Sequence, residues 1–594
     1  MSGEPRNSYD VVIVGAGMAG LTLARHLLLH TKKSVLLIDR RANPPRDASQ
    51  KVGESLVQLS GYYLSRVLDL EEHLLINHYL KYNLRFHWPT EGLANTGYED
   101  YSQSYIRKLS NIATFQLDRN VLEAHLLEAN TSTNRCEFIG GTRKVAVELG
   151  SGADDHRVSW QGGETRSRWV IDASGRGRVL GKQLELKQPS PVRHGSIFFW
   201  VDGLVNIERL TGRSRHETMY DRRRKKTGQF PLFLGTNHFC AEGQWFWVIP
   251  LHDKTSLGLV YDHGSVDPDE VSTPQKAIDY ICRKWPLFAP DLPGRTIVDQ
   301  GRFVDFSYDC KQTISDGRWA LVGEAGRFSD PLYSPGSDLI AIYNTLIVEA
   351  VETDDARALP EKCQMAELIQ RVMYESYLSS YAVSYDCLGD QEAFTLKYSW
   401  ELTIYFGFFM LPMINGLYGN LEFMGRFLQR FAILGPINHN LQQLLSDFFQ
   451  WKKRQPRVAR SEPGLFEFYD MKPLLDAETL FYETGLTADE VIAVIERHVE
   501  RLREFARYII AHIHARVTGD LEILSSGSFI SSLTLEHTVF DPVAMSAAVA
   551  RHKGSRETWT WNLDPLALFH DVVTTESVSE TAHLQQGAMS HHGK

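Results

Sequence analysis

The chain has 594 residues, 23% of them charged, and a formal net charge of −10, a composition typical of a soluble globular protein with more than one domain. The acidic balance gives no general field that attracts nucleic-acid phosphate, so we expect no nucleic-acid partner. Six scattered cysteines without metal-ligand spacing predict reduced thiols and no metal site. A polar N-terminus and the lack of an apolar run of about 18 residues predict a cytoplasmic protein with no transmembrane segment.

A glycine-rich turn stands near the start of the chain. An apolar run typical of a buried strand, Val11–Val14, precedes it, and helical spacing of apolar residues follows over Leu21–Leu29. Between them Gly15, Gly17 and Gly20 have the GxGxxG spacing that lets a backbone approach a pyrophosphate at a helix N-terminus. The strand before and the helix after the turn favour dinucleotide binding over an ordinary surface turn.

The next segment supplies the acidic residue that such a turn requires. A second strand, Ser34–Ile38, ends in Asp39, at the spacing where a carboxylate binds a ribose hydroxyl. A polar loop over residues 40–50 follows, and it leads to Lys51–Ser55. We therefore expect this part of the chain to line the cofactor site.

The middle of the chain alternates between strands and helices. Alternating polarity predicts a strand over Tyr79–Trp88, and an amphipathic pattern predicts a helix over Asn120–Leu127. Residues Arg143–Trp169 read as paired strands, and Val170–Gly175 reads as a buried strand that enters a glycine turn. The helix over Asn120–Leu127 should return the chain to the nucleotide domain.

The second half of the chain changes from strands to helices. Residues 185–305 are rich in strand-like runs and predict an inserted sheet, and Trp319–Val322 predicts another buried strand. A helix should cover Leu339–Val351, with Ser337 or Asp338 as its cap. From about residue 360 the pattern is mainly helical.

Four segments carry a family resemblance. In chain order they are Lys51–Ser55 (KVGES), the strand from Lys81 to Phe86 and Trp88, Gln244–Pro250 (QWFWVIP, similar to a WxWxIP signature), and Asp330–Gly336 (DPLYSPG). Together they make residues 8–350 resemble the flavin-dependent halogenases, a branch of the FAD-binding monooxygenase-like fold. The resemblance implies an α/β (α+β overall) protein. Its domains would be a Rossmann-like FAD-binding domain (1–184 and 306–355), an inserted β-sheet substrate domain (185–305), a mainly helical C-terminal subdomain (356–575) and a disordered tail (576–594).

The same resemblance implies a chemistry. Reduced FAD, oxygen and chloride or bromide would yield hypohalous acid, which travels through the protein to a lysine beside the substrate. Lys81 would polarise that acid as an ammonium or form a haloamine as a neutral amine, and both routes need a partly desolvated side chain. A strand lysine with its head in solvent is the structural alternative. Trp245 and Trp247 share one side of their strand and would separate flavin from substrate, although two core tryptophans would show the same alternation.

The resemblance also implies a set of site residues. The expected catalytic residues are Lys81, Trp245, Trp247 and Tyr333. The expected cofactor residues are Gly15, Gly17, Met18, Ala19, Gly20, Asp39, Arg40, Gly53, Glu54, Ser55, Arg119, Asp172, Gly323, Glu324, Gly336 and Ser337, and halide would lie at Ser334 and Gly336.

Three residues depart from the family pattern. Tyr333 stands where tryptophan halogenases have Glu, which favours the phenol- or pyrrole-acting branch. Pro335 has no backbone N–H at the turn that holds the halide, which removes one donor. Glu324 stands where related flavoproteins often have Asp, although it should still reach a ribityl hydroxyl.

Two further stretches have open interpretations. The basic run Arg222–Lys226 is either a solvated loop or a docking site for an acidic carrier protein or a flavin reductase. The aromatic run Trp400–Ile414 could wall a pocket, form a dimer face, touch a membrane or simply be buried.

The favoured function is a halogenase that acts on an electron-rich, phenolic or similar aromatic compound, free or carrier-tethered. It would take reduced FAD from a separate NAD(P)H-flavin reductase, because the sequence holds no second GxGxxG. A homodimer is compatible with these features. The alternatives are a halogenase-like monooxygenase or dehydrogenase without halide chemistry, for which Pro335 is the main support, and a flavin-binding protein without turnover.

Overall fold

The computed structural model describes residues 6–42, 51–152, 155–225, 231–456, 460–552 and 564–570. The predicted disordered tail over 576–594, Lys226 and the side chains of residues 222–224 lie outside the described part of the chain. The interpretations of the tail and of the basic run therefore stay predictions.

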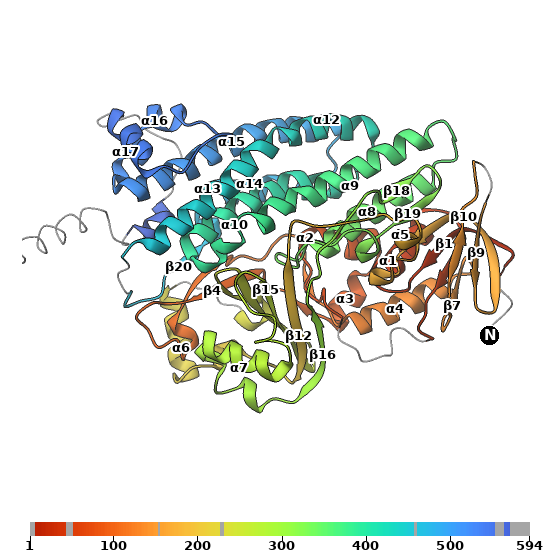
Figure 1. Ribbon diagram of the computed structural model, residues 1–594, viewed down its shortest axis with the longest axis horizontal. Helices are drawn as coiled ribbons and strands as arrows, with labels where there is room; N and C mark the ends of the chain where they lie inside the picture. The colour runs from red at the N-terminus through yellow and green to blue at the C-terminus, as the bar shows by residue number, and fades with distance from the viewer. Residues whose placement is uncertain are drawn as a thin grey trace, which may run out of the picture.

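A mostly parallel sheet forms the end of the molecule at the right of Figure 1. Its strands, in spatial order, are β18 (Ile314–Ser315), β19 (Trp319–Leu321), β10 (Gly163–Asp172), β1 (Ser8–Val14), β2 (Val35–Ile38) and β7 (Cys136–Ile139), with β8 (Ala146–Glu148) and β9 (His156–Trp160) extending β10. Strand β1 pairs in parallel with β10 and β2, and helix α1 (Met18–His30) connects β1 to β2. Helix α4 (Arg119–Thr131) packs against α1. This arrangement confirms the predicted Rossmann-like domain.

A second, mixed sheet lies at the lower centre of Figure 1. Its order is β16 (Ile297–Phe303), β12 (His194–Asp202), β15 (Lys254–Asp262), β14 (Gln244–Pro250), β13 (Thr236–Ala241), β4 (Leu84–Pro89), β5 (Tyr101–Tyr105) and β20 (Leu465–Glu467). Side chains alternate along these strands, so Phe246 packs in the cluster that contains α7 (Pro274–Lys284), whereas Trp245 and Trp247 face the main core. The sheet thus draws strands from residues before and after the predicted insert of 185–305.

The predicted strand over Tyr79–Trp88 is interrupted. Strand β3 (Tyr79–Leu80) pairs with β6 (Phe115–Gln116), and β4 begins only at Leu84. Between them Asn83 has a φ of 60°, a left-handed conformation that no strand continues. The alternating pattern alone did not reveal the break, which turns Lys81 into the protein interior.

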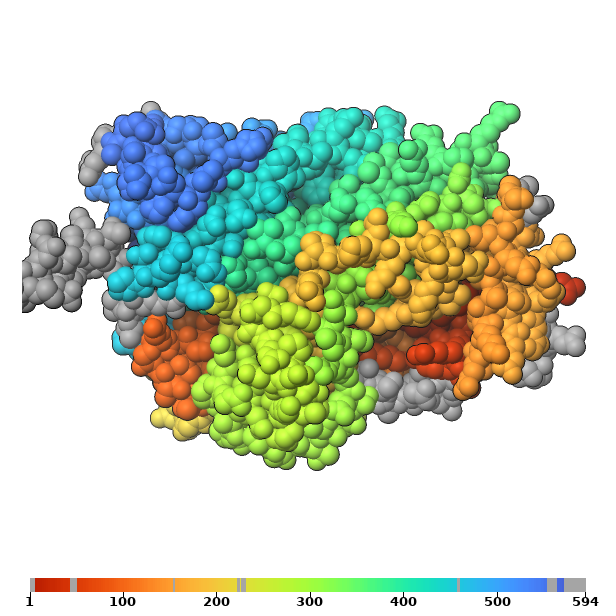
Figure 2. Space-filling model, in the orientation of Figure 1, coloured from red at the N-terminus to blue at the C-terminus, as the bar shows by residue number. Residues whose placement is uncertain are grey.

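Helices from the C-terminal half form an upper layer over both sheets, as Figures 1 and 2 show. They include α8 (Pro335–Val351), α9 (Leu359–Ala382), α10 (Gln391–Tyr405), α11 (Leu411–Ile414), α12 (Leu421–Ala432), α13 (Leu434–Arg454), α14 (Lys472–Leu480), α15 (Ala488–Thr518), α16 (Gly527–Ser532) and α17 (Pro542–Arg551). Shorter elements elsewhere are α2 (Gln58–Tyr62), α3 (Glu71–Asn77), α5 (Val179–Gln183), α6 (Arg215–Lys225) and the β11–β17 pair (Lys187–Gln188 and Asp309–Cys310).

The aromatic run Trp400–Ile414 is a continuous helical stretch within this layer. It comprises the end of α10, a π-helical turn over Phe406–Met410, and α11. Most of its side chains are buried. Among the helices of the described ranges, none combines the length and the apolar character needed to cross a membrane.

Candidate active site

The glycine turn after β1 combines two tightly packed glycines with one open glycine. A Cβ on Gly15 would lie 2.2 Å from the Ala173 carbonyl oxygen, and a Cβ on Gly20 would lie 2.0 Å from the Gly15 carbonyl oxygen. A Cβ on Gly17 would meet no protein atom within 4 Å. The turn therefore leaves the backbone at Gly17 accessible, as the approach of a cofactor pyrophosphate requires.

Asp39 lies at the end of β2, beside this turn. Its carboxylate accepts hydrogen bonds from the backbone N–H groups of Ala16 and Arg41, both at 2.8 Å, and it forms an ion pair with the Arg41 side chain. Burial raises the pKa of Asp39, but the hydrogen bonds from Arg41 and Ala16 outweigh it and leave the pKa below its usual value. The predicted Arg40 is exposed, and Arg41 is the arginine that contacts Asp39.

Two cavities lie between the sheets and the helical layer. The smaller cavity, of about 150 Å³, is lined by these predicted residues: Met18, Gly53, Glu54, Ser55, Arg119, Trp245, Trp247, Gly323, Glu324, Ser334, Gly336 and Ser337. The larger cavity, of about 470 Å³, is lined by the predicted residues Lys81 and Tyr333. The fold therefore brings distant motifs together. The other predicted cofactor residues line neither cavity: Gly15, Gly17, Ala19, Gly20, Asp39, Arg40 and Asp172.

Asp172 has its carboxylate engaged by its own chain. It accepts hydrogen bonds from the N–H and hydroxyl of Ser174 and from the N–H groups of Leu180 and Gly181. These bonds hold the turn between β10 and α5. Gly323 follows β19 with a φ of 60°, and a Cβ there would lie 3.1 Å from Ala19 Cβ, so this glycine permits close packing against α1.

Glu54 organises the floor of the smaller cavity. Its carboxyl oxygens accept hydrogen bonds from Trp200 Nε1 and Ser256 Oγ, both at 2.6 Å, and Ser256 Oγ in turn accepts one from Trp247 Nε1 at 3.1 Å. Burial raises the pKa of Glu54 to about 7, against the lowering effect of the bonds from Ser256 and Trp200. Glu54 therefore orients an indole of the predicted wall.

The two indoles lie together on one side of β14, with ring centroids 5.7 Å apart. Trp245 donates through Nε1 to the hydroxyl of Tyr385 at 2.7 Å, and that hydroxyl donates to Asp330 at 3.2 Å. Asp330 also lies 2.6 Å from His194 Nδ1. Both rings are thus held by buried hydrogen bonds on the cavity wall.

Arg119 and Glu324 are two of the charged residues that line the smaller cavity. Arg119 donates to the Val52 carbonyl and to Glu123, both at 2.6 Å, while its Nε is buried without a partner among the described residues. Glu324 forms a partly exposed ion pair with Arg176 at 3.0 Å. An unpaired guanidinium N–H in the wall of this cavity fits the anionic part of a flavin dinucleotide.

The N-terminus of α8 points at the smaller cavity. Tyr333 and Ser334 have φ values of 68° and 61°, a sparsely populated conformation for two successive residues other than glycine. Pro335 is the first helical residue, and the N–H of Ser334 is bonded to the Pro331 carbonyl. The free backbone donors of this turn therefore begin at Gly336.

The predicted cap of α8 was wrong. Ser334 is the N-cap and makes no side-chain capping bond. Asp338 instead accepts a hydrogen bond from the N–H of Ser60 at 2.9 Å, which ties α8 to α2. Tertiary contact outweighs local capping here, because the helix begins earlier than its apolar pattern indicated.

Lys81 is buried, with 2% of its surface exposed. Its Nζ donates to Ser55 Oγ at 2.8 Å and to the Leu56 carbonyl at 2.6 Å, and Ser55 Oγ is 2.8 Å from Thr236 Oγ1. Burial lowers the pKa of Lys81 to about 7, although the nearby Asp338 carboxylate raises it. Ser55 lines the smaller cavity and Lys81 lines the larger one, so the ammonium lies in the wall between them.

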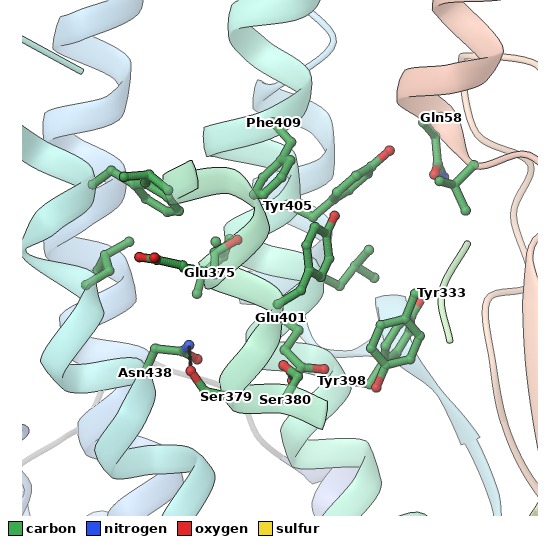
Figure 3. Close-up of a pocket in the computed structure, with 18 of the residues that line it drawn as sticks. Gln58, Tyr333, Glu375, Ser379, Ser380, Tyr398, Glu401, Tyr405, Phe409 and Asn438 are labelled. Carbon is green, nitrogen blue, oxygen red and sulfur yellow. Dashed lines mark hydrogen bonds between the residues drawn. The ribbon is translucent and has the colours of Figure 1, made fainter. Parts of the chain in front are cut away.

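The larger cavity is mainly aromatic and aliphatic. Figure 3 shows Tyr333, Tyr398, Tyr405 and Phe409 around it, with Gln58 approaching from the N-terminal region. The aromatic run Trp400–Ile414 contributes to this wall through α10 and the π-helical turn, which agrees with one of its interpretations.

Some residues of these cavities had no signal in the sequence. Thr236 and His238 alternate along β13 and both line the smaller cavity, where burial lowers the pKa of His238 to about 3 and keeps the ring neutral. Asp338, which the sequence offered only as a helix cap, lines neither cavity but lies near Lys81, and burial raises its pKa to about 7. Only the alternation of a strand could have indicated the first two residues, because no local motif contains them.

Comparison with known proteins identifies relatives of this chain. The family described as FAD dependent oxidoreductase matches residues 10–143. The flavin-dependent halogenase chlA of Dictyostelium discoideum is 26% identical over 441 residues, which cover 69% of this chain and 72% of that protein. The tetracycline 7-halogenase of Kitasatospora aureofaciens is 27% identical over 58% of this chain and 64% of its own length.

A solved structure shares the fold. The crystal structure of halogenase PltM in complex with phloroglucinol and FAD superposes with a TM-score of 0.58 at 18% identity, over 84% of this chain and 96% of that one. Curated halogenases match along much of the chain, and its nucleotide domain matches an FAD-dependent family. The chain is therefore similar to the flavin-dependent halogenases, oxidoreductases that use FAD, along much of its length.

Proposed function

We propose that this protein halogenates a free, electron-rich aromatic compound that carries a hydroxyl group. The observation that carries the proposal is the position of Lys81, which is buried between the two cavities and bonded to Ser55 at the edge of the smaller one. When bound along the glycine turn with its flavin ring at the smaller cavity, reduced FAD would activate oxygen and, with chloride or bromide, supply hypohalous acid. Two N–H groups of the Lys81 ammonium are engaged by Ser55 and Leu56, and the third is available to that acid.

The protein residues around the smaller cavity would bind and orient the cofactor. Gly17 and the unpaired N–H of Arg119 suit the pyrophosphate, and Asp39 suits a ribose hydroxyl. The backbone N–H groups of Gly336 and Ser337, at the positive end of α8, would hold an anionic flavin edge or a halide. The paired indoles would keep the substrate away from the flavin.

The larger cavity supports the substrate class. Its volume of about 470 Å³ lies in the range of sites for drug-sized compounds. Among the described residues that line it, Lys81 is the only cation, and the other charged groups are Glu375 and Glu401. An amino-acid carboxylate or the phosphate of a carrier arm would find no arginine there, so we infer a neutral, free substrate.

The partner of the reaction would be a separate NAD(P)H-dependent flavin reductase. The chain has one GxGxxG turn, and that turn fits the flavin. The names of two relatives point to different kinds of substrate. One is a tetracycline 7-halogenase, and the other is a chlorinase of a pyrrole-2-carbonyl group on a peptidyl carrier protein. The acidic groups at the larger cavity favour the first kind of substrate for this chain.

One observation favours a second candidate function. The N–H of Ser334 is used within the turn and Pro335 has none, so two backbone donors are lost beside the expected halide position. An FAD-dependent monooxygenase without halide chemistry would tolerate that loss. It would give an oxygenated product in place of a halogenated one.

Replacing the lysine tests the proposal. Lys81→Met preserves the length of the side chain and removes the charge, so we expect turnover to bromophenol to fall about 100-fold or more while FAD affinity is unchanged. The measurement is product mass with reduced FAD, oxygen, bromide and a panel of phenols, next to Lys362→Met on the surface of α9 as the matched control. Equal bromination by both variants would exclude Lys81, and an oxygenated product from the unmodified protein would establish the second candidate.

A further inference from the structure

Glu401 on α10 is a second charged group in the wall of the larger cavity. Along the chain it lies well beyond the segments that carry the family resemblance. Oε1 of Glu401 accepts hydrogen bonds from Lys397, from Ser380 and, at 3.0 Å, from Gln442. Lys397 is fully buried, and 13% of the Glu401 side chain is exposed. The three donors hold one carboxylate oxygen in a fixed position.

The other oxygen of Glu401 is available. Within the described part of the chain, neither the buried Oε2 nor the buried hydroxyl of Tyr333 has a partner with hydrogen-bond geometry. The two groups are near enough that the carboxylate, after burial, raises the pKa of Tyr333. Both residues line the larger cavity, and Figure 3 shows Glu401 beside Tyr398 and Ser380, with Tyr333 next to them.

A buried acceptor beside a buried donor is costly unless the two bond each other or a ligand completes both. A hydroxyl group can complete both at once, because it donates one hydrogen bond and accepts another. A carboxylate ligand would be repelled by Glu401, and an ether would satisfy only Tyr333. In a cavity lined by tyrosine and phenylalanine side chains, the pair therefore fits an aromatic hydroxyl.

We propose that Glu401 and Tyr333 bind the substrate hydroxyl, with Glu401 as the general base that activates the ring. This rests on the proposed function, which supplies hypohalous acid. The hydroxyl donates to Glu401 Oε2 and accepts from the Tyr333 hydroxyl. A phenolate ring is far more nucleophilic than a phenol ring, so proton transfer to Oε2 and attack on the halogen would be coupled.

The atoms balance over the cycle. The ring carbon forms its bond to the halogen, the bond between halogen and oxygen of hypohalous acid breaks, and the phenol proton moves to Oε2. The ring carbonyl then regains that proton from Glu401 as the halogenated carbon loses its hydrogen. That hydrogen leaves with the released hydroxide as water, so the products are a halophenol and water.

Binding of two matched probes tests this without turnover. The probes are 2-naphthol and its methyl ether, titrated into the FAD-loaded protein and followed by absorption. The unmodified protein should prefer the naphthol about tenfold or more, the value of a hydrogen bond to a charged group. Glu401→Gln should lose that preference, whereas Glu375→Gln, the same change at a half-exposed carboxylate of the same cavity, should keep it.

Two outcomes overturn the proposal. One is a Glu401→Gln variant with the preference of the unmodified protein, and the other is an unmodified protein that binds neither probe or binds both equally. Glu401→Gln leaves the Lys397 ammonium buried without its partner, which can prevent folding. The double variant Lys397→Met/Glu401→Gln removes that charge and is tested in parallel.

A kinetic measurement separates a base from a structural role. Free phenols ionise near a pKa of about 10, so solution phenolate can replace the missing base at high pH. The ratio of kcat for Glu401→Gln to kcat for the unmodified protein should therefore rise with pH, and a flat ratio contradicts general-base action. An unmodified protein that binds naphthol but does not halogenate it refutes the proposed function. The binding preference still shows whether Glu401 and Tyr333 bind the hydroxyl group.

Discussion

At the scale of single residues, burial decides what Lys81 can do. A strand lysine ordinarily keeps its ammonium in water. Here a break in the strand turns the side chain inward, and burial lowers its pKa to about 7. Near neutral pH the group therefore exists in both charge states, which is the condition under which the ammonium and haloamine routes can be told apart.

We expect kcat/KM for halogenation to fall as pH rises above about 7, the pKa of Lys81. The sign follows from its charge: the ammonium prevails below that pKa, and deprotonation removes the donor and the positive charge that polarise hypohalous acid. The measurement is a pH profile at saturating FAD, with FAD affinity measured at each pH as the control. A rise through the same range would instead support the neutral amine and a haloamine.

At the scale of elements, the β1–α1 turn uses its glycines for different purposes. Gly15 and Gly20 have neighbouring backbone at distances that no side chain tolerates. Gly17 has open space and an extended φ of −92°, which any residue can adopt. Two of the glycines therefore serve packing, and the third leaves open space that a ligand could enter.

This difference predicts opposite effects for the same substitution. Gly17→Ala should leave the thermal unfolding temperature of the FAD-free protein unchanged and weaken FAD binding, because its methyl group meets only the cofactor. Gly20→Ala should lower the unfolding temperature or prevent folding, because overpacking of this kind costs about 1–3 kcal/mol or more. Calorimetry and FAD fluorescence measure the two effects, and equal FAD affinity in Gly17→Ala would contradict the assignment of the turn.

At the scale of the whole molecule, the three regions share one core. A single hydrophobic cluster contains Val11 of the first sheet, Trp245 of the second sheet and Ile509 of α15. The larger cavity likewise takes its lining from residues 57–114 and from helices of residues 368–438. The predicted division at residue 355 therefore crosses a continuous apolar interface.

We expect the full chain to unfold in one thermal transition and a fragment of residues 1–355 to be insoluble. Removing the helical layer would expose the face of the sheets that carries the paired indoles, which no short segment can cover. Calorimetry of the full chain with and without FAD gives the first result, and a bound cofactor should shift the transition upward as a whole. Two separate transitions, or a soluble fragment that binds FAD, would show independent domains.

Local patterns were sufficient for the nucleotide-binding half of the site. The glycine turn, Asp39 and the QWFWVIP strand each depend on spacing within a few tens of residues, and each lies where that spacing indicated: at the turn after β1, at the end of β2 and along β14. Such features are readable because a backbone turn or an alternating strand imposes its residue types locally. The alternating pattern of Tyr79–Trp88 was readable too, but it concealed the break at Asn83.

The second half of the site required the tertiary structure. Glu401 and Asp338 stand in helices whose sequences resemble any buried helix, and they become partners of Tyr333 and Lys81 only because α8 and α10 pack over the sheets. The lowered pKa of Lys81 arises from burial, and burial is a property of the assembled layers rather than of a residue's neighbours in the chain. Spacing along the chain therefore identified the glycine turn after β1, and packing between residues hundreds of positions apart created the larger cavity.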